Sequence, residues 1–206
     1  MRIKKLKHGF QGLNKQKARV IAHLVGDGCV YKVKSNYWIR YEVKDNYLVD
    51  SFAKDIISVY GLPVTRGLNE SGKKPGNFIP FVCIRSKLAF EDLKKYCEFS
   101  SAKWFVPNRI LEAEATIKVE FLKALFDDEG TVITNRNKEV RLYSTNFKGI
   151  TQIQKMLIEL GIVSRITSGY GSKRNVYGLI VRDLRKFHNT IGFNLARKQE
   201  KLKSLL

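Results

Sequence analysis

Hydrophobic and polar positions along this chain follow two periods, one typical of helices and one typical of strands. Over 15–28, apolar residues recur at helical spacing, Asn14 is a suitable N-cap, and Gly28 ends the segment. Over 37–44 the period is two, which predicts a half-buried antiparallel strand. Its apolar face carries Tyr37, Ile39, Tyr41 and Val43, and its polar face carries Trp38, Arg40, Glu42 and Lys44.

The same succession is repeated about one hundred residues later. VIAHLVGDG at 20–28 aligns with LKALFDDEG at 122–130, which pairs Asp27 with Glu129 and Gly28 with Gly130. KDNYLVDSFAKDIISVYGLPV at 44–64 aligns with STNFKGITQIQKMLIELGIVS at 144–164, and a weaker third block follows in the same order. Two copies of this length favour a duplicated domain over a solenoid of short repeats.

Each copy predicts helix, strand pair, helix, strand pair and helix. The expected elements include helices at roughly 46–60 and 146–160, strands at 78–85 and 175–182, and a second motif helix capped by Thr116. In the second copy, Val140 and Leu142 point inward while Arg141 and Tyr143 point outward. The expected fold class is α+β, with two pseudo-symmetric halves at 1–105 and 116–206, a linker at 106–115, and helices packed on mainly antiparallel sheets.

Composition points to nucleic acid as the partner. The 206 residues are 44% hydrophobic, enough for a sizeable core, and 38 Lys and Arg against 19 Asp and Glu give a net charge of +19. This charge is spread over the whole chain, as is typical of nucleic-acid-binding proteins. No long uncharged apolar stretch or anchoring terminal helix suggests a membrane, and 1–17 is too polar for a signal peptide. We expect an intracellular protein, with an organelle left open.

Cysteine and histidine suggest no metal site of their own. Cys29, Cys83 and Cys97 are an odd number without close pairing, which argues against a disulfide framework and structural zinc. The three histidines are scattered without ligand spacing, and His23 is interpreted as an ordinary helix residue.

The ends of the two repeated helices carry the candidate chemistry. The small residues Ala22, Gly26 and Ala124 would let the two helices approach closely, which would bring Asp27 and Glu129 together at their common end. Paired carboxylates suit magnesium, which near DNA can polarise a phosphate and activate water. An acid at a helix C-terminus opposes the helix dipole, so finding it twice argues against an ordinary solvated residue. The pattern predicts metal-dependent phosphodiester hydrolysis.

The two segments resemble the paired motifs of the LAGLIDADG homing endonucleases. VIAHLVGDG is a loose match in its first half, and FLKALFDDEG, from Phe121, is a close one. AKWFVP at 102–107 resembles the lysine and proline element between the motifs, and IQKMLIELGI at 153–162 resembles the helix after the second. The resemblance covers most of the chain. It implies a monomer whose motif helices pack at the junction of two halves, with the sheets forming a saddle over the DNA major groove.

The resemblance also implies roles for individual residues. Asp27 and Glu129 correspond to catalytic residues that bind Mg²⁺ or another divalent cation, and Lys103 corresponds to the basic residue near them. The second-half partner of Lys103 is Arg197 by the repeat or the adjacent lysine, Lys198. Lys44 falls where relatives place a polar or basic residue near the site, and the second half offers Ser144 or Thr145 instead.

Two residues of the motifs are further candidate metal ligands. These are Gly26 and Asp128. Asp128 stands where the family usually has a small residue, so a tolerated polar residue at the helix junction is the alternative reading.

Outward strand residues and basic loop residues are the candidate DNA contacts. The former can pair with base edges, and the latter can bind phosphates without reading sequence. The full set is Lys32, Lys34, Trp38, Arg40, Glu42, Arg66, Lys73, Lys74, Arg85, Arg136, Lys138, Arg141, Tyr143, Lys173, Arg174, Tyr177 and Arg182.

Three functions are consistent with this resemblance. The first is a site-specific homing endonuclease that hydrolyses double-stranded DNA at a long asymmetric site and is encoded within an intron. The alternatives are a maturase that binds intron RNA and a DNA-binding regulator without cleavage. Retention of both motif acids favours cleavage. The chain does not look like a self-splicing intein, because it starts without a nucleophilic Cys or Ser and ends in KSLL.

Overall fold

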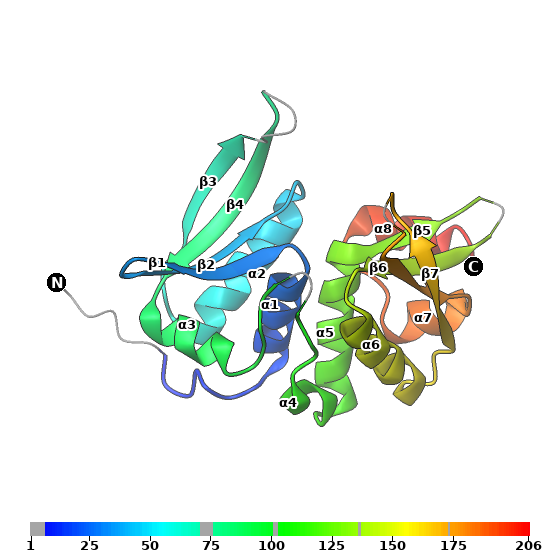
Figure 1. Ribbon diagram of the computed structural model, residues 1–206, viewed down its shortest axis with the longest axis horizontal. Helices are drawn as coiled ribbons and strands as arrows, with labels where there is room; N and C mark the ends of the chain where they lie inside the picture. The colour runs from blue at the N-terminus through cyan, green and yellow to red at the C-terminus, as the bar shows by residue number, and fades with distance from the viewer. Residues whose placement is uncertain (1–6, 71–75, 101–102, 136, 173) are drawn as a thin grey trace.

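The protein is described by a computed structural model over residues 7–70, 76–100, 103–135, 137–172 and 174–206 (Figure 1). The first half contains α1 (Lys15–Gly26), β1 (Gly28–Val33), β2 (Asn36–Glu42), α2 (Asn46–Tyr60), β3 (Thr65–Glu70), β4 (Phe78–Arg85) and α3 (Lys87–Lys94). The short helix α4 (Asn108–Leu111) follows. The second half contains α5 (Ala115–Glu129), β5 (Gly130–Ile133), β6 (Glu139–Ser144), α6 (Phe147–Glu159), β7 (Ser164–Tyr170), β8 (Val176–Val181), α7 (Leu184–Thr190) and α8 (Ala196–Lys203).

The two halves share one topology, which confirms the α+β duplication. Each has a four-stranded sheet of antiparallel neighbours, in the order β1-β2-β4-β3 or β5-β6-β8-β7. Helices cover one face of each sheet, and the opposite face is open (Figure 1). The alternation predicted for β2 is correct, since Ile39 and Tyr41 are fully buried while Arg40, between them, points to the open face.

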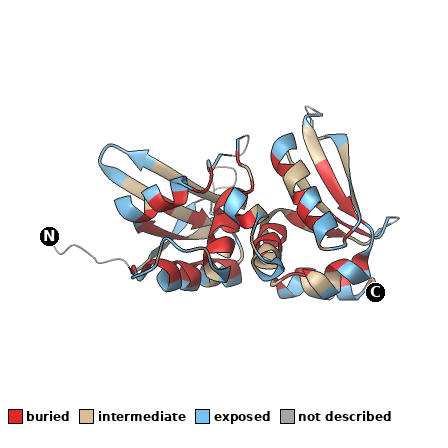
Figure 2. Cartoon of the chain, turned by 90° about the horizontal axis from the view of Figure 1, so that it is seen from below, coloured by how far each residue is buried: buried red, intermediate tan, exposed pale blue. Residues whose placement is uncertain are grey.

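Helices α1 and α5 pack side by side at the centre of the molecule, and buried residues concentrate where they meet (Figure 2). Ala22 and Ala124 are fully buried there. A Cβ atom added at Gly26 would lie 2.8 Å from Oδ2 of Asp128, so only glycine leaves room for α5 at this point. The small residues of the motifs therefore do allow the two helices to approach closely.

The beginnings of the two motif helices differ from each other. The Asn14 side chain accepts a hydrogen bond from the Lys17 backbone N–H, which confirms it as the cap of α1. The cap predicted at Thr116 is wrong, because the N-cap of α5 is Glu114, two residues earlier, and Thr116 lies inside the helix. The Thr116 hydroxyl instead donates to the Glu114 carboxylate at 2.5 Å.

In the part of the chain that the structure describes, no helix combines the length and the apolar composition needed to cross a membrane.

Candidate active site

Each motif helix runs directly into a strand, and the turn between them brings an acid to the helix end. Asp27 caps α1 and Glu129 is the last residue of α5, each followed by a glycine that begins a strand. A Cβ atom at Gly28 would lie 2.7 Å from the Leu24 Cα, and at Gly130 it would collide with the Phe126 carbonyl. Glycine thus permits the abrupt change from helix to strand that places both acids at the same end of the helix pair.

Two further acids at the end of α5 are fully engaged. Asp127 accepts hydrogen bonds from the backbone N–H groups of Asn194 at 3.0 Å and Leu195 at 3.1 Å, which joins α5 to the segment before α8. Asp128 reaches into the first half instead. Its Oδ2 lies 2.9 Å from Nδ1 of His23, and its Oδ1 accepts a hydrogen bond from the Tyr41 hydroxyl at 2.5 Å. Asp127 therefore connects α5 to the segment before α8, and Asp128 connects α5 to the first half.

Asp27 and Glu129, by contrast, accept no hydrogen bond and form no ion pair within the described ranges. Asp27 is exposed and Glu129 is half-buried. Burial, together with the negative charges of Asp27 and Asp128, raises the pKa of Glu129 to about 7, although Lys198 counteracts this. Two crowded carboxylates without partners form a site at which a cation would relieve repulsion.

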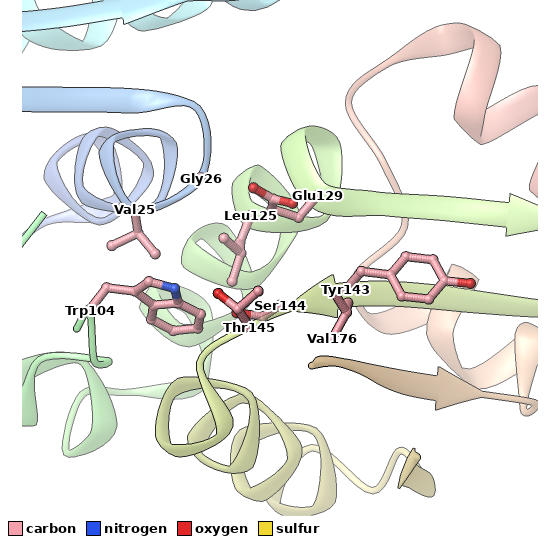
Figure 3. Close-up of a pocket in the computed structure, with 9 residues that line it drawn as sticks. All are labelled: Val25, Gly26, Trp104, Leu125, Glu129, Tyr143, Ser144, Thr145 and Val176. Carbon is pink, nitrogen blue, oxygen red and sulfur yellow. The ribbon is translucent and has the colours of Figure 1, made fainter. Parts of the chain in front are cut away.

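Glu129 and Asp27 open into separate pockets. The Glu129 pocket is shown in Figure 3, and its other lining residues are Val25, Gly26, Trp104, Leu125, Tyr143, Ser144, Thr145 and Val176. The Asp27 pocket is lined by Val43, Lys44, Asp45, Leu48 and Arg197. The two pockets occupy equivalent places in the two halves. Each is lined by one motif acid and by residues at the end of the second strand of that half, β2 or β6. The expected neighbours Lys44 and Asp27 do lie together.

The structure separates the roles of Lys198 and Arg197. Lys198 is buried, and its Nζ donates to the carbonyls of Asp127 and Gly130, each at 2.5 Å, and of Phe126 at 3.2 Å. It therefore caps the C-terminal end of α5. Arg197 instead lines the Asp27 pocket, with its Nε 3.6 Å from Oδ2 of Asp45.

Lys103 lies on the side of Glu129. Its side chain is exposed, and it directly precedes Trp104, which lines the Glu129 pocket. Trp104 is positioned by the second half, because its ring packs where a Cβ at Gly149 would lie 2.5 Å away and its carbonyl accepts from the Asn146 side chain.

Asp128 and His23 bind each other across the junction of the two halves. Both oxygens of Asp128 are hydrogen-bonded, so its bonding favours the structural alternative over metal binding. His23 was expected to be an ordinary helix residue, but it is the partner of this carboxylate. Burial, the largest single effect, lowers the pKa of His23, but the charge and hydrogen bond of Asp128 together with the charges of Asp127 and Asp55 raise it overall. The sequence pattern lacks any signal for this pair, because the two residues are 105 positions apart.

The donors present suit a hard cation with an incomplete protein shell. In the described ranges, no three acidic, histidine or cysteine side chains converge on one point. Two carboxylates, with Gly26 lining the Glu129 pocket, leave coordination positions for water or phosphate oxygens, as magnesium sites usually do.

Comparison with known proteins agrees with this geometry. A family model described as a LAGLIDADG-like domain matches residues 116–192. The homing endonuclease I-ApeI of Aeropyrum pernix is 28% identical over 198 residues, which cover 89% of this chain and 86% of that protein. The replicative DNA helicase DnaB of Synechocystis is 23% identical over 198 residues, but these are only 22% of DnaB. The second half of the chain thus matches a LAGLIDADG-like domain, and most of the chain is similar to a homing endonuclease.

Solved structures of the homing endonuclease I-DmoI share the fold. Its mesophilic variants match with a TM-score of 0.67 and 20% identity, over 92% of this chain and 97% of that one. I-DmoI in complex with DNA and Mn matches with a TM-score of 0.63 and 18% identity, over 86% of this chain and 96% of that one. The family-model match includes nearly all of α5, and α1 is its counterpart in the first half by the shared topology.

Several candidate DNA contacts lie on the open faces of the two sheets. On the first sheet these are Trp38, Arg40, Glu42 and Arg85, and on the second they are Arg141 and Tyr143. Arg182 is exposed directly after β8, and its Nε lies 3.5 Å from Glu139. Lys34, Lys138 and Arg174 are exposed in the turns β1–β2, β5–β6 and β7–β8.

Three other candidates lie on the helix-covered faces of the sheets, away from the open faces that carry the other strand candidates. Lys32 is paired with Tyr37 and lies 5.2 Å from its ring. Arg66 forms an ion pair with Asp50 of α2. Tyr177 packs on Phe147 of α6, with ring centroids 5.0 Å apart. The sequence did not reveal strand parity at these positions, because each strand here mixes polar and apolar residues on both faces. Lys73, Lys74, Arg136 and Lys173 lie outside the described residues.

Proposed function

We propose that this chain is a monomeric, site-specific endonuclease that cuts both strands of duplex DNA with the help of a divalent cation. The observation that carries the proposal is that two of the four acids at the helix ends are hydrogen-bonded and two are not. Asp127 and Asp128 are bonded within the protein, whereas Asp27 and Glu129 line two separate pockets and have no bonding partner among the described residues. This division favours cleavage over the maturase and regulator alternatives, which would not need two free carboxylates.

The donor set fits Mg²⁺ or another divalent cation. Both candidate ligands are hard oxygen donors, and burial and neighbouring negative charge raise the pKa of each. When bound, such a cation would polarise a DNA phosphate and make water a stronger nucleophile. Asp27 and Glu129 would hold the cation, and the protein charge of +19 would attract the DNA backbone.

The two pockets would act on their DNA strands with different chemistry. Lys44 and Arg197 bring two positive charges to the Asp27 pocket, where they can bind a phosphate and stabilise the charge that develops on it. Ser144, Thr145 and Trp104 offer the Glu129 pocket hydroxyl groups and an aromatic ring, with Lys103 exposed beside it. We infer unequal cutting rates for the two strands, which would make a nicked duplex the intermediate.

The open faces of the two sheets also differ in sequence, which supports a long and asymmetric target. One half presents Trp38 and Arg40 where the other presents Glu139 and Arg141. An origin in an intron reading frame is part of the same proposal.

Cleavage of a randomised duplex library in Mg²⁺, followed by sequencing of the ends, tests the proposal. We expect breaks at one long sequence, and none when EDTA replaces Mg²⁺. Selective duplex binding without breaks would support the regulator, and selective binding of structured RNA would support the maturase. Either result would overturn the endonuclease.

A further inference from the structure

Three planar groups lie in a row across the open face of the first sheet. Tyr31 of β1 is directly opposite Trp38 of β2, and Trp38 is directly opposite Arg85 of β4. The rings of Tyr31 and Trp38 are stacked, with centroids 6.1 Å apart and planes 7° apart. The guanidinium carbon of Arg85 lies 3.9 Å from the centre of the Trp38 ring. Each group therefore orients the next.

This stacking leaves the N–H groups of Arg85 available. A guanidinium that lies on an aromatic face keeps its donors at its edge, and the stack restricts its side-chain freedom before any ligand arrives. Arg85 is exposed, and it has neither an ion pair nor a hydrogen-bond acceptor within the described ranges. It is an ordered cation whose donors have no partner.

The neighbouring arginine is different. Arg40 stacks on Phe81 at 3.8 Å, but it also donates to Oε2 of Glu42 at 3.1 and 2.6 Å. Asn69 donates to the same carboxylate at 3.1 Å. Arg40 is thus satisfied by the protein, and a base would have to compete with Glu42 for its donors.

The second sheet has no equivalent of this arrangement among its described residues. Arg141 is bound by Glu139 and donates to the Tyr143 hydroxyl at 3.1 Å, and Arg182 also lies 3.5 Å from Glu139. Arg141 also lies over the Tyr170 ring at 5.8 Å, but Glu139 binds it and Arg182, and Arg165 on the same face stacks on no aromatic ring among the described residues. The ordered, unpartnered guanidinium is a property of the first half.

We propose that Arg85, held flat against Trp38, reads one guanine in the part of the DNA target that lies over the first sheet. Two of its N–H groups would donate to O6 and N7 of the base in the major groove, the pairing that a guanidinium fork fits best. Trp38 and Tyr31 fix the plane of the fork and hence the base pair that it meets. This inference rests on the proposed duplex binding, and it makes Arg85 a determinant of specificity.

The test is selection of bound sequences from a randomised duplex library in EDTA, which prevents cleavage. The wild-type chain is compared with Arg85→Ala, Arg85→Lys and, as a control on the other open face, Arg165→Ala. Arg165 is exposed in β7 and belongs to the half-site of the second sheet. We expect one guanine of the wild-type consensus to become any base with Arg85→Ala, and to be partly kept with Arg85→Lys. Arg165→Ala should leave that position unchanged.

A second measurement identifies the atom that is read. Replacing the guanine by 7-deazaguanine removes N7 but keeps O6, and we expect wild-type affinity to fall about tenfold, towards the lower end of the range for a complete bidentate contact. Arg85→Ala should bind both duplexes equally. The inference is overturned if Arg85→Ala selects the wild-type consensus, or if it loses the same affinity for every sequence, as a phosphate contact would. A wild-type chain without any sequence preference would overturn the proposed function as well, which distinguishes the two failures.

Discussion

Asp128 of α5 and His23 of α1 form an ion pair across the junction of the two halves, with Oδ2 and Nδ1 2.9 Å apart. The two side chains are 0% and 2% exposed, and the Tyr41 hydroxyl of β2 binds the other carboxylate oxygen. Because Asp128 directly precedes Glu129, this contact sets where the end of α5 lies relative to α1 and Asp27. The pair thus positions Glu129 relative to Asp27 in the candidate active site.

Asp128→Ala should lower the free energy of unfolding by about 3 kcal/mol or more, because it leaves His23 buried without its partner and Tyr41 without an acceptor. Urea denaturation measures this loss. Asp50→Ala is the matched control, since Asp50 pairs with Arg66 at the surface and such pairs contribute about 1 kcal/mol or less. Equal losses in the free energy of unfolding for the two variants would show that the junction pair contributes no more to stability than a surface ion pair does.

Lys198→Met should lower stability, whereas Arg197→Met should slow cleavage. The first removes the donor to the carbonyls of Phe126, Asp127, Asp128 and Gly130 where α5 ends and β5 begins, so we expect a loss of about 2 kcal/mol of stability. The second removes an exposed cation from the Asp27 pocket, so stability should change little while cleavage of one DNA strand slows. Thermal unfolding and a strand-resolved nicking assay separate the two effects. If Arg197→Met were the destabilising variant, the assignment of roles would be reversed.

Stability without metal should fall as pH rises through neutrality. Glu129 has an ordinary pKa of 4.5 and a pKa of about 7 in the folded protein, so the folded state binds more protons between these values. The stabilisation that follows is fully present below pH 4.5 and is lost as pH rises through about 7, amounting to about 1–3 kcal/mol.

Mg²⁺ should therefore raise the melting temperature more at pH 8 than at pH 5, because only the ionised carboxylates bind it. Glu129→Gln is the control, and in EDTA at pH 8 it should be more stable than the wild-type chain. A wild-type stability that rises between pH 5 and pH 8 relative to Glu129→Gln would contradict the repulsion inferred at this site.

Local patterns were sufficient to predict much of the fold. The alternation around Ile39 and Arg40 gave the correct faces of β2, and glycine after each motif acid marked the ends of α1 and α5. These features depend on residues close together in the chain. The duplication, seen from the spacing of Asp27 and Glu129, then placed the two helices at a common junction.

Contacts between distant residues could not be predicted in the same way. Asp127, Asp128 and Glu129 are consecutive acids, and nothing in their local sequence says that the first binds Asn194, the second binds His23 and the third stays unengaged. Their directions follow from the helical rotation of about 100° per residue combined with the packing of α5 against two different neighbours. The choice between Lys198 and Arg197 depended on the same packing.

The central claim is that Asp27 and Glu129 are the two groups that make cleavage possible. Its most direct test is the rate of cutting of each strand of a selected duplex in Mg²⁺ by Asp27→Asn and by Glu129→Gln, with duplex affinity measured in parallel. We predict that each variant loses about 100-fold or more in double-strand cleavage, the scale of a group that acts at the reacting centre, while affinity is nearly unchanged. Cleavage of both strands at the wild-type rate by either variant would contradict the account.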